Sequence, residues 1–119
     1  MSLIVQKFGG SSVADAGRVR NVARIITETC RKGHSVVAVL SAQGDTTDEL
    51  IEKAREINPQ ASRREMDMLL STGEQVSIAL CAMAIERLGC QAVSLAGWQA
   101  GVVTDSNHSA ARIKPIRTE

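Results

Sequence analysis

The chain has 119 residues, of which 44% are hydrophobic, and its 14 basic and 13 acidic side chains give a formal net charge of +1. This length suits one globular domain, and so balanced a charge provides no field that would attract nucleic acid or a membrane surface. Only 2% of the residues are aromatic, which also argues against base stacking. We therefore expect no nucleic-acid partner and no membrane partner.

The N-terminus and the cysteines predict an intracellular, cytoplasmic protein. The opening "MSLIVQKF" lacks the basic start and long apolar segment of a signal peptide, and no apolar run approaches the roughly 20 residues that span a bilayer. Cys30, Cys81 and Cys90 contain no CxxC pair, so we expect free, buried thiols in a reducing compartment. His34 and His108 fit no zinc-binding spacing, so no metal site built by the protein is expected.

The first half of the chain alternates between strand-like and helix-like patterns. Residues 3–8 predict a strand that ends at two glycines, and residues 14–32 predict a helix that Gly33 closes in the left-handed conformation. Residues 35–40 are apolar on both faces. This pattern is typical of a central parallel strand covered by helices on each side.

Two capping-box spacings follow. Thr46 and Glu49 begin a predicted helix that ends at Asn58 and Pro59, with an apolar stripe of Leu50, Ile51, Ala54 and Ile57. Ser62 and Glu65 begin a helical period that extends to Gly89, and "STGEQ" at 71–75 interrupts it. The pattern predicts two helices or one bent helix.

The C-terminal part predicts a third strand over residues 91–96 and a short fourth over 101–105. The last ten or so residues read as an unfinished connection. Strands that alternate with helices in this order imply βαβ units. The predicted fold is α/β, a three-layer α-β-α sandwich with a mainly parallel sheet that is apparently incomplete.

Two glycine-containing loops are expected at one edge of this sheet. "KFGGSS" and "SAQGDTTDE" each follow a parallel strand, and ligands of such sheets bind beyond the carboxyl ends of the strands. Gly9, Gly10 and Gly44 would expose amides to a phosphate, and Lys7 would supply a mobile positive charge. The glycine spacing matches neither a P-loop nor a dinucleotide fingerprint, so on spacing alone a simple turn remains the more common explanation.

Structural explanations also compete for the other polar residues. Ser12 with Asp15, and Ser71 with Glu74, fit capping boxes that need no ligand. Ser41 and Thr47 are hydroxyl residues of a kind common in turns and first helical turns. Trp98 is more often a core or lid anchor than a ligand contact.

Four motifs together resemble one known family. "KFGGSSVAD" at 7–15, "LSAQGDTTDELI" at 40–51, "LLSTGEQVSIAL" at 69–80 and "GWQAGVVTD" at 97–105 are similar, in this order, to the N-terminal part of aspartate kinase, in the amino-acid kinase superfamily. The resemblance implies phosphorylation of the β-carboxylate of L-aspartate by ATP with Mg²⁺. The product, 4-phospho-L-aspartate, leads to lysine, threonine and methionine.

The resemblance also assigns roles to individual residues. Lys7 would be the catalytic group that neutralises the phosphate, and Gly9, Gly10 and Ser11 would form the phosphate-binding turn. Ser41 and Thr47 would lie at the aspartate and the transferred phosphate, and Glu74 would pair with the α-ammonium group of aspartate. No general base is expected, because the attacking carboxylate is already ionised near neutral pH.

The family resemblance further implies that residues 1–119 form the N-terminal portion of a kinase domain. We expect the half that binds most of the nucleotide, and regulatory ACT domains, to be absent from this chain, which by itself would show negligible kinase activity. A homo-oligomer is possible, because an unfinished sheet exposes an edge and apolar surface. Two alternatives remain open: a glutamate or acetylglutamate kinase, or a noncatalytic α/β binding fragment.

Overall fold

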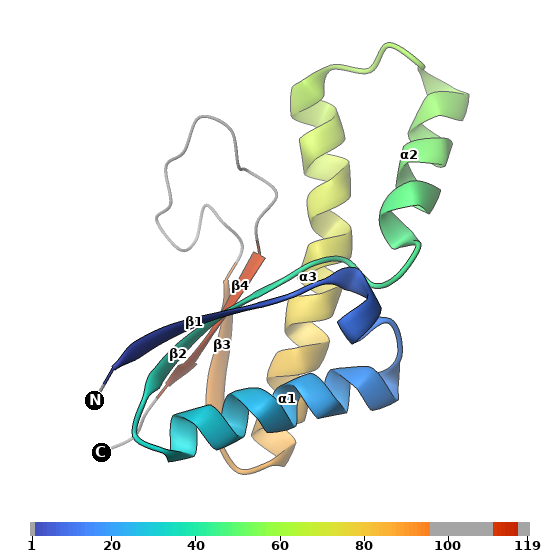
Figure 1. Cartoon of the computed structure of the whole chain (residues 1–119). Coiled ribbons are helices and arrows are strands. Elements are labelled where there is room, and N and C mark those ends of the chain that lie inside the picture. The colour runs from blue at the N-terminus through green and yellow to red at the C-terminus, as the bar shows by residue number, and fades with distance from the viewer. Residues whose placement is uncertain (1, 96–110, 117–119) are drawn as a thin grey trace.

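The structure, a computed structural model, describes residues 2–95 and the strand at 111–116 (Figure 1). Its elements in chain order are β1 (Leu3–Phe8), the 3-10 turn η1 (Gly10–Val13), α1 (Ala16–Arg31), β2 (Ser35–Leu40), α2 (Thr46–Ile57), α3 (Arg63–Arg87), β3 (Gln91–Leu95) and β4 (Ala111–Ile116). The predicted strand at 101–105, Trp98 and His108 lie outside the described residues.

The sheet has the strand order β1-β2-β4-β3. β1 and β2 pair in parallel from Leu3 with Ser35 to Phe8 with Leu40, so these two strands end at the same edge. β4 pairs antiparallel with β2 and with β3, which makes β3 run in the same direction as β1 and β2. Three of the four described strands therefore run in one direction, as predicted, but the reversed strand β4 lies between β2 and β3, so that only β1 and β2 pair in parallel.

Both long helices that cover the sheet lie on one face of it. α1 packs against α3 and β2, while α3 packs against β3 and β4 (Figure 1). On β1, the side chains of Leu3 and Val5 point to the opposite face and are 66% and 65% exposed. The described part of the chain thus forms two layers, and the prediction that helices cover β2 on both sides does not hold within it.

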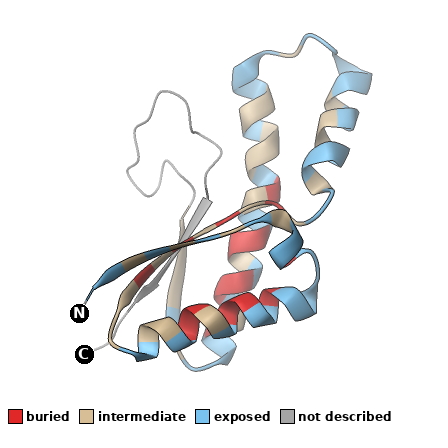
Figure 2. Ribbon diagram, in the orientation of Figure 1, coloured by how far each residue is buried: buried red, intermediate tan, exposed pale blue. Residues whose placement is uncertain are grey.

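The core lies between the two helices and this face of the sheet (Figure 2). Alternate residues of β2 point into it, which is the two-residue period of a strand with one covered face. The cluster consists of Val13, Val19, Val22, Ala23, Ile26, Val36, Ala38, Leu40, Ile78, Cys81 and Ile85. Burial raises the pKa of the Cys81 thiol to about 12, so this cysteine is a packing residue at neutral pH.

The start of α1 differs from the predicted capping box. Asp15 is the N-cap, and its side chain accepts a hydrogen bond from the backbone N–H of Arg18. Ser12 belongs to η1, a turn that the helical period does not reveal. At the other end of α1, Gly33 has the predicted left-handed conformation, with φ of +97°.

The helices α2 and α3 form an antiparallel pair that extends away from the sheet (Figure 1). Ser62 is the N-cap of α3 and accepts a hydrogen bond from the Glu65 backbone N–H, as predicted. At α2, by contrast, the N-cap is Asp45, and no side chain caps the helix. The predicted apolar stripe of α2 is only partly covered, because Ile57 is 87% exposed.

α3 is one helix of 25 residues that passes through "STGEQ" without interruption. The hydroxyl groups of Ser71 and Thr72 donate to the carbonyls of Met68 and Leu69, a bond that lets serine and threonine remain inside a helix. Ser71 and Glu74 therefore form no cap. The sequence favoured an interruption because small and polar residues interrupt the apolar period there.

The length and apolar character of α3 bear on the expectation that no segment of the chain could span a bilayer. It is the one helix of the described residues whose length and hydropathy would permit a membrane span. Ile78, Cys81 and Ile85 of this helix are buried in the core, so it has the character of a core helix. Met68, Val76, Leu80 and Met83 on its outer face remain 40–61% exposed.

The strand β4 lies where the sequence pattern predicted an unfinished connection. Its segment, "ARIKPI", contains two charged residues and a proline, all of which weaken a strand pattern. Pairing with β2 on one side and β3 on the other makes it a strand nonetheless.

Substitutions at two core positions are expected to change the stability in opposite directions. Thr27 is 1% exposed, and its hydroxyl has no hydrogen-bond partner among the described residues. Thr27→Val should therefore raise the free energy of unfolding by about 1 kcal/mol, because a buried polar group without a partner is costly. Ile26→Ala, at the adjacent fully buried position, should lower it by about 2–5 kcal/mol. Urea unfolding followed by circular dichroism measures both, and a loss of stability in Thr27→Val would contradict the packing described.

Candidate functional site

The turn that follows β1 is held in one conformation by its own backbone. Gly9 has extended dihedral angles, φ −79° and ψ 174°, and its carbonyl oxygen lies 3.1 Å from the Ser12 nitrogen that donates to it. η1 then leads directly into α1 through Asp15. The turn therefore combines an extended glycine with one tight helical turn at the end of a strand.

The loop that follows β2, residues 41–45, is bonded directly to this turn. The Ser41 N–H donates to the Phe8 carbonyl and the Gly44 N–H to the Gly10 carbonyl, each across 3.1 Å. A methyl group on Gly10 would lie 2.8 Å from the Ala42 carbonyl oxygen, so a side chain there would force the loops apart. The sequence prediction that the two glycine-containing loops share one sheet edge is confirmed by this contact.

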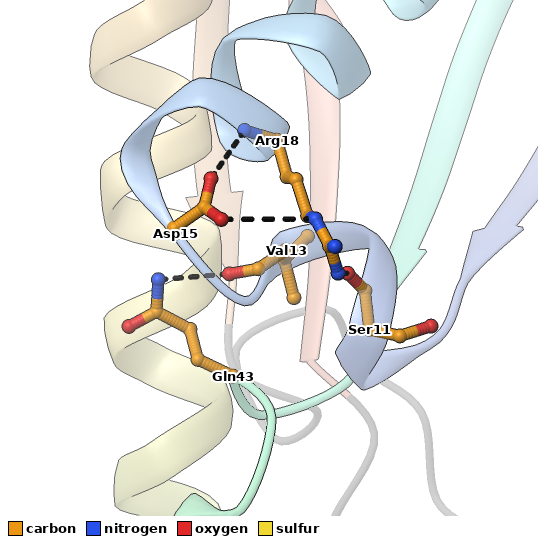
Figure 3. A network of polar contacts seen from close by, with 5 residues as sticks. All are labelled: Ser11, Val13, Asp15, Arg18 and Gln43. Atoms are coloured by element: carbon orange, nitrogen blue, oxygen red, sulfur yellow. Dashed lines mark hydrogen bonds and ion pairs between the residues drawn. The ribbon is translucent and has the colours of Figure 1, made fainter.

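Two side chains add further bonds to the turn (Figure 3). Arg18 Nη1 donates to the Ser11 carbonyl at 2.7 Å, and Gln43 Nε2 donates to the Val13 carbonyl at 2.8 Å. The carboxylate of Asp15 also holds Arg18 in place, because its Oδ2 atom lies 3.7 Å from the Nε atom of Arg18. Neither donor was predicted from the sequence. The three-residue spacing of Asp15 and Arg18 was a signal for one, whereas nothing local marks Gln43.

The third motif reaches the same place through Gly73 of α3. A methyl group on Gly73 would lie 3.0 Å from the Ala42 Cβ atom and 3.2 Å from the Thr46 Cγ2 atom. The next residue, Glu74, is half-buried, and its Oε2 atom is shielded from solvent. The motif at 7–15 thus touches the motif at 40–51, and the motif at 69–80 touches the motif at 40–51 as well.

The remaining predicted site residues are placed around these loops. Lys7 is exposed on β1, Ser11 is exposed in η1, Ser41 is half-buried, and Thr47 is exposed in the first turn of α2. Within the described residues, none of these four side chains forms a hydrogen bond or an ion pair with another protein group. Lys7 alternates with Gln6 and Phe8, so it points to the sheet face opposite α1.

Three successive backbone amides of the turn have no acceptor in the part of the chain that the structure describes. They are the N–H groups of Gly9, Gly10 and Ser11. A methyl group on Gly9 would have no heavy atom within 4 Å, so the space beside this residue is open. Consecutive free amides next to an open space form a typical anion-binding arrangement.

A shallow hollow of about 410 Å³ lies on the α1 side of this turn. Its lining is partly polar and partly apolar and consists of Phe8, Ser11, Ser12, Arg18, Asn21, Val22 and Ile25. The hollow gives the serine side of the turn access to solvent.

Comparison with known proteins shows that this chain is similar to aspartokinases. The curated proteins that the chain resembles include an aspartokinase of Geobacillus stearothermophilus, 56% identical over 99% of this chain, and one of Corynebacterium glutamicum, 58% identical over 98%. A crystal structure of aspartate kinase from Synechocystis matches 72% of this chain with 55% identity and a TM-score of 0.70.

The chain spans only part of these proteins: 29% of the length of the first relative, 28% of the second and 15% of the Synechocystis chain. A model of the amino acid kinase family matches residues 2–119, which is nearly the whole sequence. The chain therefore belongs to the amino acid kinase family.

Proposed function

We propose that this chain provides the substrate side of an aspartate kinase, which transfers the γ-phosphoryl group of ATP to the β-carboxylate of L-aspartate. The observation that carries the proposal is the convergence of three separated motifs at one sheet edge, through Gly10 against Ala42 and Gly73 against Ala42. Its relatives' name, aspartokinase, supports this acceptor over glutamate or acetylglutamate.

The turn after β1 would bind the transferred phosphate. Its free amides at Gly9, Gly10 and Ser11 suit phosphate oxygens, and Lys7 would add a positive charge from the end of β1. Two anions must approach each other in this reaction, and the transition state spreads charge over the phosphoryl oxygens. Donors that are already oriented stabilise such a charge without further reorganisation.

Aspartate would lie between the loop at 41–45 and α3. Glu74 is the only carboxylate among the proposed site residues, and pairing it with the α-ammonium group of the substrate would fix the orientation of the amino acid. Ser41 and Thr47, whose hydroxyls have no bond to protein groups in the described part of the chain, would contact the substrate carboxylate and the phosphate.

The reaction itself needs little proton chemistry. A β-carboxylate oxygen forms a bond to the γ-phosphorus while the bond from that phosphorus to the β,γ-bridging oxygen breaks, and ADP leaves with that oxygen. The nucleophile is ionised near neutral pH, so the residues act by positioning and by electrostatics. Mg²⁺ would arrive with ATP, whose phosphates supply several of its ligands. The free cysteines agree with the reducing cytoplasm as the site of action.

Adjacent glycines test the phosphate role. Gly9→Ala has room and an allowed backbone, so stability should be kept while binding of inorganic phosphate weakens, because the methyl group enters the space beside the amides. Gly10→Ala should lower the urea midpoint, because its methyl group meets the Ala42 carbonyl. Isothermal calorimetry and urea unfolding measure these effects, and unchanged phosphate binding in Gly9→Ala would count against the phosphate role.

Lys7 is expected to act in the transition state. The rate is measured in a chimera in which residues 1–119 replace the matching segment of the Geobacillus aspartokinase, because this chain spans 29% of that relative. Lys7→Ala should lower kcat by about 10²- to 10³-fold, the usual effect of removing one oriented donor. Lys53→Ala, a lysine exposed on α2, is the control, and near-normal kcat in Lys7→Ala would rule out this role.

Glu74 is expected to act on aspartate alone. In the same chimera, Glu74→Gln should weaken L-aspartate binding by about tenfold or more, because a charged pair is lost, while ATP affinity stays unchanged. Calorimetry with L-aspartate, L-glutamate and D-aspartate measures this, with Glu56→Gln, exposed on α2, as the control. Equal losses for aspartate and ATP would indicate general damage and not the proposed pairing.

A further inference from the structure

The carbonyl groups of the turn after β1 receive hydrogen bonds from several directions. The Ser41 N–H donates to Phe8, the Ser12 N–H to Gly9 and the Gly44 N–H to Gly10, each across 3.1 Å. A peptide group is planar, and its C=O and N–H point in opposite directions. Fixing these three carbonyls therefore orients the N–H groups of Gly9, Gly10 and Ser11, the same amides that have no acceptor within the described residues.

Arg18 extends this control to the next peptide group. Its Nη1 atom donates to the Ser11 carbonyl at 2.7 Å, while Asp15 accepts from the Arg18 backbone N–H at 2.8 Å and lies 3.7 Å from its Nε atom. The Arg18 and Asp15 side chains are 58% and 64% exposed. An ion pair this exposed adds little to stability, so its clearest consequence is the direction of the guanidinium group and of the carbonyl that it holds.

Gln43 connects the far end of the same turn to the second loop. Its Nε2 atom donates to the Val13 carbonyl at 2.8 Å across 30 positions of sequence (Figure 3). The Val13 side chain is fully buried, which anchors this end of the turn in the core. Gln43 itself comes from the loop whose Gly44 N–H already holds the Gly10 carbonyl. The two loops are therefore bonded at both ends of η1.

We propose that Arg18 and Gln43 are positioning residues for the free amides at Gly9, Gly10 and Ser11. They hold the Ser11 and Val13 carbonyls, which belong to later peptide groups of the same turn, and so keep η1 in the conformation in which the backbone bonds to Phe8, Gly9 and Gly10 orient those amides. Neither side chain needs to touch a substrate. The benefit of oriented amides for phosphate transfer rests on the proposed function above. The orientation itself is a property of the chain, and it can be measured without a ligand.

The test is backbone ¹⁵N relaxation of the full chain and of Arg18→Ala and Gln43→Leu. We expect order parameters of about 0.85 at the three amides in the unchanged chain, falling below about 0.6 in both variants. Arg18→Lys, which keeps a donor on a long side chain, should restore part of the order. Arg24→Ala, which breaks the exposed pair with Glu28 at 3.0 Å on the same helix, and Gln60→Leu, in the turn between α2 and α3, are the controls.

Each outcome has one meaning. Unchanged order parameters at the three amides in both variants overturn the proposal. A loss of order that extends through α1 and α3, together with a lower urea midpoint, also overturns it, because the two residues would then have a merely structural role. A titration with inorganic phosphate separates this from the proposed function. We expect about two- to tenfold weaker binding in both variants. Local loss of order in the variants, with no phosphate binding even by the unchanged chain, would support positioning and contradict the phosphate role.

Discussion

The close approach of the loops after β1 and β2 is the constraint on which the rest of this structure depends. Parallel pairing from Leu3 to Phe8 brings the two strand ends together, and the absence of a side chain on Gly10 lets the Ala42 carbonyl pass at a distance that a methyl group would not allow. The bond from Gly44 to Gly10 then fixes the contact. Without this approach, the motifs at 7–15 and 40–51 would be neighbours only in topology.

Helix α3 brings a third motif to this contact in the same way. Gly73 allows the helix to lie against Ala42 and Thr46, and the continuous helix carries Glu74 beside that point. The C-terminal half of α3 is held in the core by Ile78, Cys81 and Ile85, so packing about one to three turns away helps to set the position of Glu74. The core and the candidate site are thus linked by one helix, which runs through "STGEQ" without a break.

Much of the fold follows from the sequence because the relevant signals are local. The strands at 3–8 and 35–40, the end of α1 at Gly33 and the cap at Ser62 depend on patterns a few residues long. The same local signals are misleading where tertiary pairing overrides them. "ARIKPI" is a poor strand pattern, yet β4 lies between two strands, and Ser71 with Glu74 fits a cap, yet the helix already passes through both.

The sequence by itself determined the family, the βα alternation and the two loops at one sheet edge, because motifs and periodicity are written in neighbouring residues. Only the tertiary structure decided which groups meet there. The contacts of Gly10 with Ala42 and of Gln43 with Val13 join positions about 30 residues apart, and no spacing rule relates such positions. The proposed role of Arg18 depends on the direction of the Ser11 carbonyl, and that direction exists only once the turn has folded against the second loop.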